Sequence, residues 1–385
     1  MKFASFGITA VTASLLSRFS HAGFPDDEDG SLNRHLARKL GKNDNGNGIR
    51  PEEDNHTIDL IVKYKNEDGH IIADSYDKTG RGRDISVKYH TEVITTNKEY
   101  MEALKNDPNI ESVEVDSEIY ALPNMRGYVP TGERGRRLEE ETPYGIDMVN
   151  PEPRLEQGIH PIKVCVIDTG YDNNHTDLPD LDANDGFSPY DGQTWDHDGH
   201  GHGTHCAGTI GAIGGNAQGV TSLNPDPTKF KFFISKGLRD TGSGTGSGLL
   251  SAVESCIENE ANIISMSLGG GGFSDIMNTL FNTYYEDQGV LIIAAAGNDG
   301  NSAYNYPASY ASIMSVAAVD MNGVKASFSQ YNDQVEIAAP GVLVKSTLPG
   351  NEYASWSGTS MATPHVAGVA ALVWSHFPQC SNKHI

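Results

Sequence analysis

The chain has 385 residues, of which 37% are hydrophobic, and it carries a formal net charge of −23. This length allows two or three domains, and the apolar content is sufficient for a packed core. A strongly acidic surface repels nucleic acid and anionic membranes, so the composition argues against both as partners. No apolar run reaches the roughly 18 residues that a membrane-spanning helix needs.

The N-terminus has the pattern of an export signal. Lys2 supplies a positive charge, residues 3–16 are apolar, and Ser20-His21-Ala22 offers small residues for a signal peptidase. We therefore expect residues 1–22 to be a signal peptide and the protein to be secreted to the extracellular space. Residues 23–56 are polar and rich in Asp, Asn, Gly and Arg, which is typical of a linker.

Residues 57–122 have the pattern of a compact α+β unit. Three stretches alternate apolar and polar residues as strands do, and one has helical spacing. The strands are predicted at Thr57–Tyr64, Ile85–Ile94 and Ile110–Val115, and the helix at Asn97–Asn106. Strands interleaved with a helix predict a small α+β sandwich.

Residues 123–142 form an irregular segment. They contain Arg134-Gly135-Arg136-Arg137, an exposed basic stretch that is suited to proteolytic cleavage. The alternative is a plain interdomain linker.

The sequence from Pro143 onward is typical of an α/β domain. Near-continuous apolar runs predict buried parallel strands at Ile162–Ile167, Phe230–Ser235, Ile263–Ser267, Val290–Ala296 and Ser312–Val319. Leu249–Ile257 and Thr363–Trp374 have helical spacing. In such sheets, functional groups collect at the carboxyl ends of the strands.

Two candidate acid–base groups lie next to these elements. Asp168 directly follows the run Ile162–Ile167, where α/β proteins also place carboxylates for metal or ribose. His202 lies among glycines that allow a tight entry into a helix beginning near Thr204, so it can act as a general base near neutral pH. The alternative is a zinc site formed by His197, His200, His202 and His205. Their spacing lacks the helical His-Glu-x-x-His of metalloproteases.

A serine and an asparagine complete the set of candidates. Ser360 precedes a predicted helix, where unpaired amides and the helix dipole favour a developing negative charge. Asn298 follows the run Val290–Ala296, and its side-chain amide can donate to an oxyanion. A helix-capping serine and a turn asparagine are the simpler alternatives.

The order Asp168, His202, Asn298 and Ser360, each within its own glycine-rich block, resembles the subtilisin-like serine proteases. The similarity spans about residues 144–378 and includes Asp-Thr-Gly, His-Gly-Thr-His, Ser-Leu-Gly, Ala-Ala-Gly-Asn and Gly-Thr-Ser-Met-Ala-Thr-Pro-His-Val-Ala-Gly. The resemblance implies a three-layer α/β domain with a mainly parallel sheet over residues 143–385. It also implies a serine endopeptidase of broad specificity toward proteins and peptides. In that family Ser360 would be the nucleophile, His202 the base, Asp168 its partner and Asn298 an oxyanion donor.

The same resemblance assigns the substrate groove. Gly242-Ser243-Gly244 and Ser267-Leu268-Gly269 match the two edges that pair with an extended substrate, and Asn305 would line the pocket for the residue before the cut. Gly246 implies a roomy subsite four residues before the cut. A phosphate-binding loop at the glycines around Gly244 is the alternative, but its lysine is missing.

A structural calcium site is a further implication. Asp177 matches a family ligand, and the loop 214–220 offers Asn216 together with the carbonyls of Gln218 and Val220.

Residues 57–122 resemble the family's inhibitory propeptide, a small ferredoxin-like domain that assists folding and is then removed. We expect residues 123–142 to be the processing linker, with a cut between Tyr128 and Thr142, and a monomeric product. The chain ends soon after the serine helix, whereas relatives continue. The alternative is therefore a truncated, non-maturing subtilase that acts only as a binding or inhibitory module.

Four cysteines and two glycosylation sequons complete the sequence features. The connectivity of Cys165, Cys206, Cys256 and Cys380 cannot be deduced from their spacing. The positions of Cys165 and Cys206 are compatible with free, buried thiols. The sequons are Asn55-His56-Thr57 and Asn174-His175-Thr176.

Overall fold

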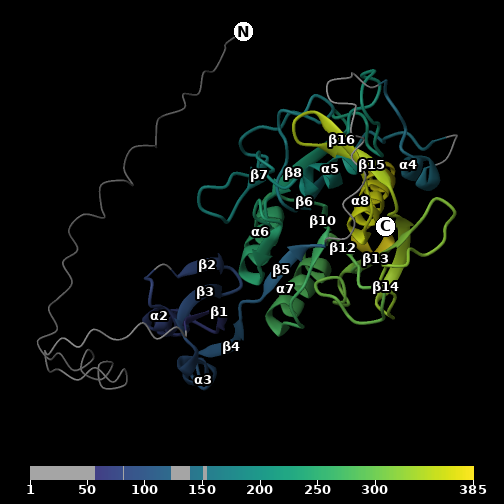
Figure 1. Ribbon diagram of the computed structural model, residues 1–385. Coiled ribbons are helices and arrows are strands. Elements are labelled where there is room, and N and C mark those ends of the chain that lie inside the picture. Colours follow the sequence, from purple (N-terminus) through teal and green to yellow (C-terminus); the bar gives the residue numbers. More distant parts are fainter. Residues whose placement is uncertain (1–56, 81, 123–138, 151–153) are drawn as a thin grey trace, which may run out of the picture. The chain divides into compact units, whose positions relative to one another are not determined.

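A computed structural model describes residues 57–80, 82–122, 139–150 and 154–385 of the chain (Figure 1). All of these residues belong to one compact unit, residues 55–385. The predicted signal peptide, the polar linker, the basic stretch Arg134–Arg137 and the sequon at Asn55 lie outside the described residues. Within the described residues, no helix is both long and apolar enough to cross a membrane.

A seven-stranded sheet forms the centre of the larger part. Its order is β14-β13-β12-β10-β6-β8-β7, and every neighbouring pair is parallel. The strands are β6 (Ile162–Ile167), β7 (Gly186–Phe187), β8 (Phe230–Ser235), β10 (Ile263–Met266), β12 (Leu291–Ala295), β13 (Met314–Val319) and β14 (Val335–Pro340). The five predicted strands are confirmed. The two edge strands lacked a sequence signal because β7 is only two residues long and β14 has exposed residues in its middle.

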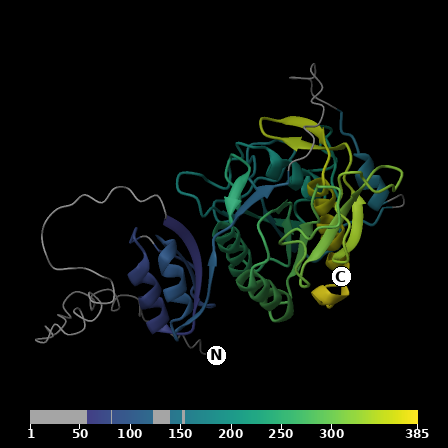
Figure 2. The ribbon, with the colours of Figure 1, turned by 60° about the horizontal axis from the view of Figure 1, so that its bottom comes forward.

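Helices cover both faces of this sheet (Figures 1 and 2). Alternate residues of a strand point to opposite faces, and β6 shows this clearly. Cys165 and Ile167 pack in one apolar cluster with α6 (Gly246–Glu258) and α7 (Asp275–Glu286). Val164 and Val166 pack in a second cluster with α5 (His202–Gly211) and α8 (Thr359–His376). The predicted three-layer α/β domain is therefore confirmed.

Smaller elements flank these layers. The short helix α4 (Tyr144–Val149) contacts α8 and β14. Strands β15 (Val344–Leu348) and β16 (Glu352–Trp356) form an antiparallel hairpin. The last element is a single 3₁₀ turn, η2 (Asn382–His384).

Residues 57–115 form a separate antiparallel sheet of order β2-β3-β1-β4. Its strands are β1 (Thr57–Tyr64), β2 (Arg83–Ser86), β3 (Thr91–Asn97) and β4 (Ile110–Val115), and its helices are α2 (Glu67–Tyr76), η1 (Lys98–Tyr100) and α3 (Met101–Lys105). The single strand expected at Ile85–Ile94 is wrong, because a turn that places His90 at φ 53° divides it into β2 and β3. Helix α2 was missed because it buries only Gly69 and Ala73, which leaves little apolar periodicity.

A third, three-stranded sheet joins distant parts of the chain. Strand β5 (Glu118–Ala121) lies between β9 (Ser243–Thr245) and β11 (Leu268–Gly269), antiparallel to both. Residues 118–121 thus complete a sheet whose other two strands, β9 and β11, lie next to the layers of the large sheet.

A disulfide links Cys165 of β6 to Cys256 of α6, and both residues are fully buried. A free Cys165 is therefore wrong, because its side chain points to the sheet face that α6 covers. Cys206 is free and buried, as expected, and Cys380 is free and partly exposed.

Candidate active site

An aspartate and a histidine meet where β6 ends and α5 begins. Asp168 directly follows β6, and His202 is the first residue of α5. Nδ1 of His202 lies 2.7 Å from an Asp168 carboxylate oxygen, and both side chains are buried. Gly203 permits this approach, because a Cβ there would collide with the carbonyl oxygen of Gly170.

The environment of this pair favours a charged imidazole. Burial by itself would lower the pKa of His202, but the Asp168 carboxylate outweighs burial, and the pKa lies well above its usual value. Among the described residues, Nε2 of His202 has no hydrogen-bond partner. The ring therefore has one nitrogen held by a carboxylate and the other available to exchange a proton.

Ser360 lies in the first turn of α8 and is buried. Its hydroxyl donates to the carbonyl of Ser267 at 3.1 Å and to that of Leu122 at 3.4 Å. The Cys206 sulfur lies 3.9 Å from Nδ1 of His202 and 3.6 Å from the carbonyl oxygen of Ser360. One thiol thus contacts both the histidine and the serine, so these two residues occupy the same small region.

A proline in α8 explains how the Ser360 backbone is held. Pro364 lies inside the helix, and it has no N–H to donate to the carbonyl four residues earlier, which is that of Ser360. Instead, the Ser267 hydroxyl (2.8 Å) and the Cys206 thiol (3.6 Å) donate to this carbonyl. Burial raises the pKa of the Cys206 thiol, which keeps it a donor.

Asn298 follows β12, and its amide has a fixed orientation. Its oxygen accepts hydrogen bonds from the backbone N–H (2.9 Å) and the hydroxyl (3.0 Å) of Thr359. Its nitrogen donates to the carbonyl oxygen of Leu122 at 3.2 Å. The same Leu122 oxygen thus lies within hydrogen-bond reach of the Asn298 amide and the Ser360 hydroxyl, which places the Leu122 carbonyl group next to both side chains.

The residues before Leu122 lie as an extended strand between the two edges that were expected to bind substrate. Ile119 pairs with Gly244, and Tyr120 pairs with both Ser243 and Gly269. Ala121 pairs with Leu268, and its N–H donates to the Gly242 carbonyl at 2.8 Å. The two edges expected from the sequence thus flank one strand, which makes antiparallel pairs with both. The role of residues 119–122 had no separate sequence signal, because their partners lie more than 100 residues away.

Two other residues that were expected to line the substrate site, Asn305 and Gly246, have defined neighbours. Asn305 packs directly behind Gly269, where a Cβ would collide with its amide, and it donates to the Ala295 carbonyl at 3.4 Å. Gly246 faces the methyl group of Met277. Ile119 is buried in the same apolar cluster as Met277.

The alternatives from the sequence find no geometric support. His205 is buried and stacks on Trp356, and burial lowers its pKa to about 3. His197 is largely exposed and faces Asp240. The described residues therefore do not bring the four histidines together as metal ligands. The glycines around Gly244 border the strand-pairing edge instead of opening into a phosphate loop.

Of the four residues expected to bind calcium, Asn216 and Val220 contact the third, the buried carboxylate of Asp177. Asp177 is fully buried and accepts hydrogen bonds from the Val220 N–H (2.9 Å), the Asn216 amide nitrogen (2.6 Å) and the Tyr353 hydroxyl (3.2 Å). The side-chain amide nitrogen of Gln218 donates to the Thr176 carbonyl at 2.8 Å, which ties the loop 214–220 to the segment that carries Asp177.

The charge balance at this site fits a cation. Burial raises the pKa of Asp177 to about 6, and the nearby Glu140 carboxylate adds to the effect. Among the described residues, no lysine, arginine or histidine forms an ion pair with Asp177. The carboxylates of Asp177 and Glu140 are hard oxygen donors of the kind that Ca²⁺ prefers, whereas the groups that contact Asp177 in this structure are N–H and O–H donors. Asn216 would have to turn its amide to offer oxygen. Glu140 was not predicted from the sequence.

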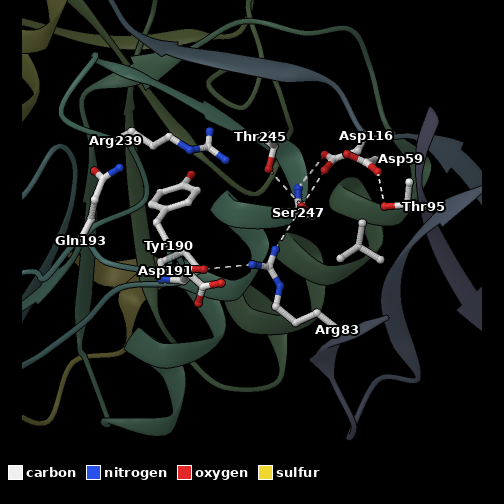
Figure 3. Close-up of a pocket in the computed structure, with 12 residues that line it drawn as sticks. Asp59, Arg83, Thr95, Asp116, Tyr190, Asp191, Gln193, Arg239, Thr245 and Ser247 are labelled. Carbon is white, nitrogen blue, oxygen red and sulfur yellow. Dashed lines mark hydrogen bonds between the residues drawn. The ribbon is translucent and has the colours of Figure 1, made fainter. Parts of the chain in front are cut away.

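A cavity of about 450 Å³ lies between the small sheet, which contributes Arg83 and Thr95, and the region that contributes Tyr190 and Ser247 (Figure 3). At its edge the Asp116 carboxylate accepts from the N–H (2.8 Å) and hydroxyl (2.6 Å) of Ser247 in the first turn of α6. Arg83 contacts the same hydroxyl at 3.3 Å and the Pro189 carbonyl at 3.1 Å. Glu114 accepts from the Ile276 N–H in the first turn of α7 at 3.1 Å. Two acidic residues thus occupy two helix N-termini, which is the favourable polarity.

Comparisons with known proteins agree with this architecture. The model of the subtilase family matches residues 160–385. A thermostable alkaline protease of Halalkalibacterium halodurans is 37% identical, over 85% of this chain and 83% of that protein. Subtilisin DY of Bacillus licheniformis is 40% identical, over 64% of this chain and 89% of its own length. The crystal structure of Apa1, a psychrophilic subtilisin-like protease from an Antarctic Pseudoalteromonas, matches with a TM-score of 0.55 and 28% identity, over 63% of this chain and 90% of that chain. The chain belongs to the subtilase family of serine endopeptidases.

Proposed function

We propose that this chain is a secreted, monomeric endopeptidase in which Ser360, His202 and Asp168 form the catalytic triad. The observation that carries this proposal is the Leu122 carbonyl, which receives hydrogen bonds from Ser360 and Asn298 at the end of an extended, paired strand. A peptide bond placed there lies where acyl transfer would occur.

In the proposed reaction the Ser360 hydroxyl turns from the Ser267 carbonyl toward His202 and attacks the substrate carbonyl. The neutral form of His202 takes the hydroxyl proton at Nε2, and Asp168 holds the resulting imidazolium through Nδ1. Asn298 donates to the oxyanion, and its orientation is set by Thr359 before the substrate arrives. His202 then gives the proton to the leaving nitrogen, and water releases the acyl group by the same route in reverse.

The segment seated in the groove supports a specificity for apolar residues at two positions. Ile119, four residues before the cut, is 2% exposed, whereas Tyr120 is 42% exposed. Ala121 is 4% exposed, so its subsite suits a small residue. We propose broad specificity with preferences for a branched apolar residue at the position of Ile119 and an apolar residue at that of Leu122.

This proposal predicts how peptide substrates rank. For the processed enzyme, replacing the isoleucine of an Ile-Tyr-Ala-Leu-Ser peptide by alanine should lower kcat/KM by about 10- to 100-fold, from about 0.8 kcal/mol for each buried methylene lost. Replacing the tyrosine by alanine should change it by less than about threefold. Hydrolysis of quenched fluorescent peptides gives both values. A larger loss for the tyrosine than for the isoleucine would contradict the proposed subsites.

We propose that residues 57–122 are the intramolecular inhibitor of this enzyme. Strand β5 fills the groove, and Asp116 and Glu114 hold the first turns of α6 and α7. A substrate cannot pair with β9 and β11 while β5 occupies them. The domain boundaries at residues 122 and 143 belong to this proposal, with 123–142 as the processing linker.

We propose that Ca²⁺ stabilises the loop 214–220. Asp177 and Glu140 would supply carboxylates, Asn216 its side-chain oxygen, and Gln218 and Val220 their carbonyls. The ion would neutralise the buried Asp177 and tie the loop to the segment around Glu141, whose N–H donates to the Gly219 carbonyl at 2.9 Å. It would take no part in peptide hydrolysis.

Calcium removal should therefore lower thermal stability. Saturation at about 100 times Kd contributes about 2.7 kcal/mol, and a domain of this size loses about 2–4 °C per kcal/mol, so chelation should lower Tm by about 5–10 °C. Calorimetry on the Ser360→Ala precursor avoids self-digestion. Asp177→Asn should abolish the response to calcium, whereas Asp180→Asn at an exposed neighbour should retain it. Equal Tm values for the Ser360→Ala precursor with and without calcium would contradict the site.

Two observations support secretion. A disulfide such as Cys165–Cys256 persists in oxidising compartments. The sequon asparagine Asn174 is exposed, so a glycosylating secretory pathway would have access to it.

A further inference from the structure

We infer that the peptide bond seated in the active site, Leu122–Pro123, resists cleavage, so that residues 57–122 remain a tethered inhibitor until a bond beyond Pro123 is cut. This inference rests on the proposed function and extends it to the control of activation.

The first step of the argument is the register of β5. Four backbone pairings fix the strand: Glu118 with Thr245, Ile119 with Gly244, Tyr120 with Ser243 and Ala121 with Leu268. The next residue, Leu122, has its carbonyl oxygen 3.2 Å from Nδ2 of Asn298 and 3.4 Å from Oγ of Ser360. The bond presented to the nucleophile is therefore the one between residues 122 and 123.

The second step is the chemistry of that bond. Residue 123 is proline, so the leaving nitrogen is tertiary and carries a ring carbon in place of hydrogen. Cleavage requires Ser360 to attack the Leu122 carbon, the C–N bond to break, and His202 to deliver a proton to the nitrogen lone pair. That nitrogen must invert for its lone pair to face His202. At a proline nitrogen this inversion must move a ring carbon instead of a hydrogen, which hinders the step.

The third step is that the same proline favours binding. A residue before proline is biased toward extended backbone, which is the conformation that an antiparallel edge pairing requires. Leu122 is thus held ready for binding while the bond after it is protected. Tight pairing with slow turnover is the behaviour of an inhibitor and not of a substrate.

Three further contacts keep the tethered segment in place. Asp116 and Glu114 hold helices α6 and α7 independently of the active-site bond, at 2.8 and 3.1 Å from backbone N–H groups. Ser86 donates to the buried Glu254 of α6 at 2.8 Å. Residues 57–122 therefore contact the peptidase layers at several points outside the groove, and these contacts do not depend on the Leu122 carbonyl.

The test measures the intact mass of the precursor over time. Four forms of the full chain are compared: the native chain, Pro123→Ala, Ser360→Ala, and the double variant that carries both substitutions. The native chain should yield no fragment ending at Leu122, and its cuts should fall after Pro123. Pro123→Ala should produce a fragment ending at Leu122 that Ser360→Ala abolishes. Pro130→Ala, a proline in the same linker, should behave as the native chain.

A peptide pair measures the effect directly and separates the two proposals. The processed enzyme should cleave Ile-Tyr-Ala-Leu-Ala at least about 10²-fold faster than Ile-Tyr-Ala-Leu-Pro, the scale of an impaired general-acid step. Cleavage of the two peptides at similar rates, or a native fragment ending at Leu122, overturns the inference and leaves the proposed function intact. Failure to cleave either peptide overturns the proposed function and the inference with it.

Discussion

Replacing Ser360 by alanine should reduce kcat by on the order of 10⁶-fold, the magnitude that subtilisin itself shows for its serine. The hydroxyl is the only nucleophile of the proposed mechanism, and Asn298 cannot compensate because it stabilises a charge that no longer forms. The residual rate should exceed that of water by about 10³-fold, from the oxyanion donor and substrate binding. Burst-phase and steady-state assays with a chromogenic peptide measure both quantities.

The fold should survive this change. The Ser360 hydroxyl makes hydrogen bonds to two carbonyls, and losing a typical hydrogen bond costs about 1 kcal/mol. The variant should therefore keep its disulfide and a cooperative melt. Ser302→Ala, at an exposed position, should keep native kcat. Activity of Ser360→Ala within tenfold of the native enzyme would refute the assignment of the nucleophile.

Replacing Asn298 by alanine should lower kcat by about 10²- to 10³-fold with a small change in KM, which corresponds to about 2.7–4 kcal/mol. Subtilisin is the source of this magnitude. The amide lies 3.2 Å from the Leu122 carbonyl oxygen, so it already contacts a bound carbonyl, but the bond strengthens as charge develops on that oxygen. A kinetic comparison that separates kcat from KM tests this reasoning.

The neighbouring Asn301→Ala offers a matched control. Asn301 is exposed, and its side chain accepts from the Ala303 N–H at 2.8 Å in the same loop. The Asn301→Ala substitution should change kcat by less than about twofold. A loss confined to KM in Asn298→Ala would mean that this amide binds substrate and transition state equally, and it would remove Asn298 from the oxyanion site.

The sequence was informative where the signal is local. Near-continuous apolar runs predicted the five central strands because a strand buried on both faces needs apolar residues at every position. The glycine-rich blocks around Asp168, His202, Asn298 and Ser360 identified the family because each block is contiguous in the chain. Helix α7 had no prediction from the sequence, although Ser274 caps it and its Met277 faces Gly246.

The tertiary structure alone decided the features that join distant segments. Cys165 and Cys256 are 91 residues apart, and only the face of β6 toward α6 brings them together. Ser360 and Leu122 are 238 residues apart, so no local pattern could show that the bond before Pro123 is the one presented to the nucleophile. The sequence by itself determines which side chains are present and in which order, whereas the register of a strand is fixed by its partners elsewhere in the fold.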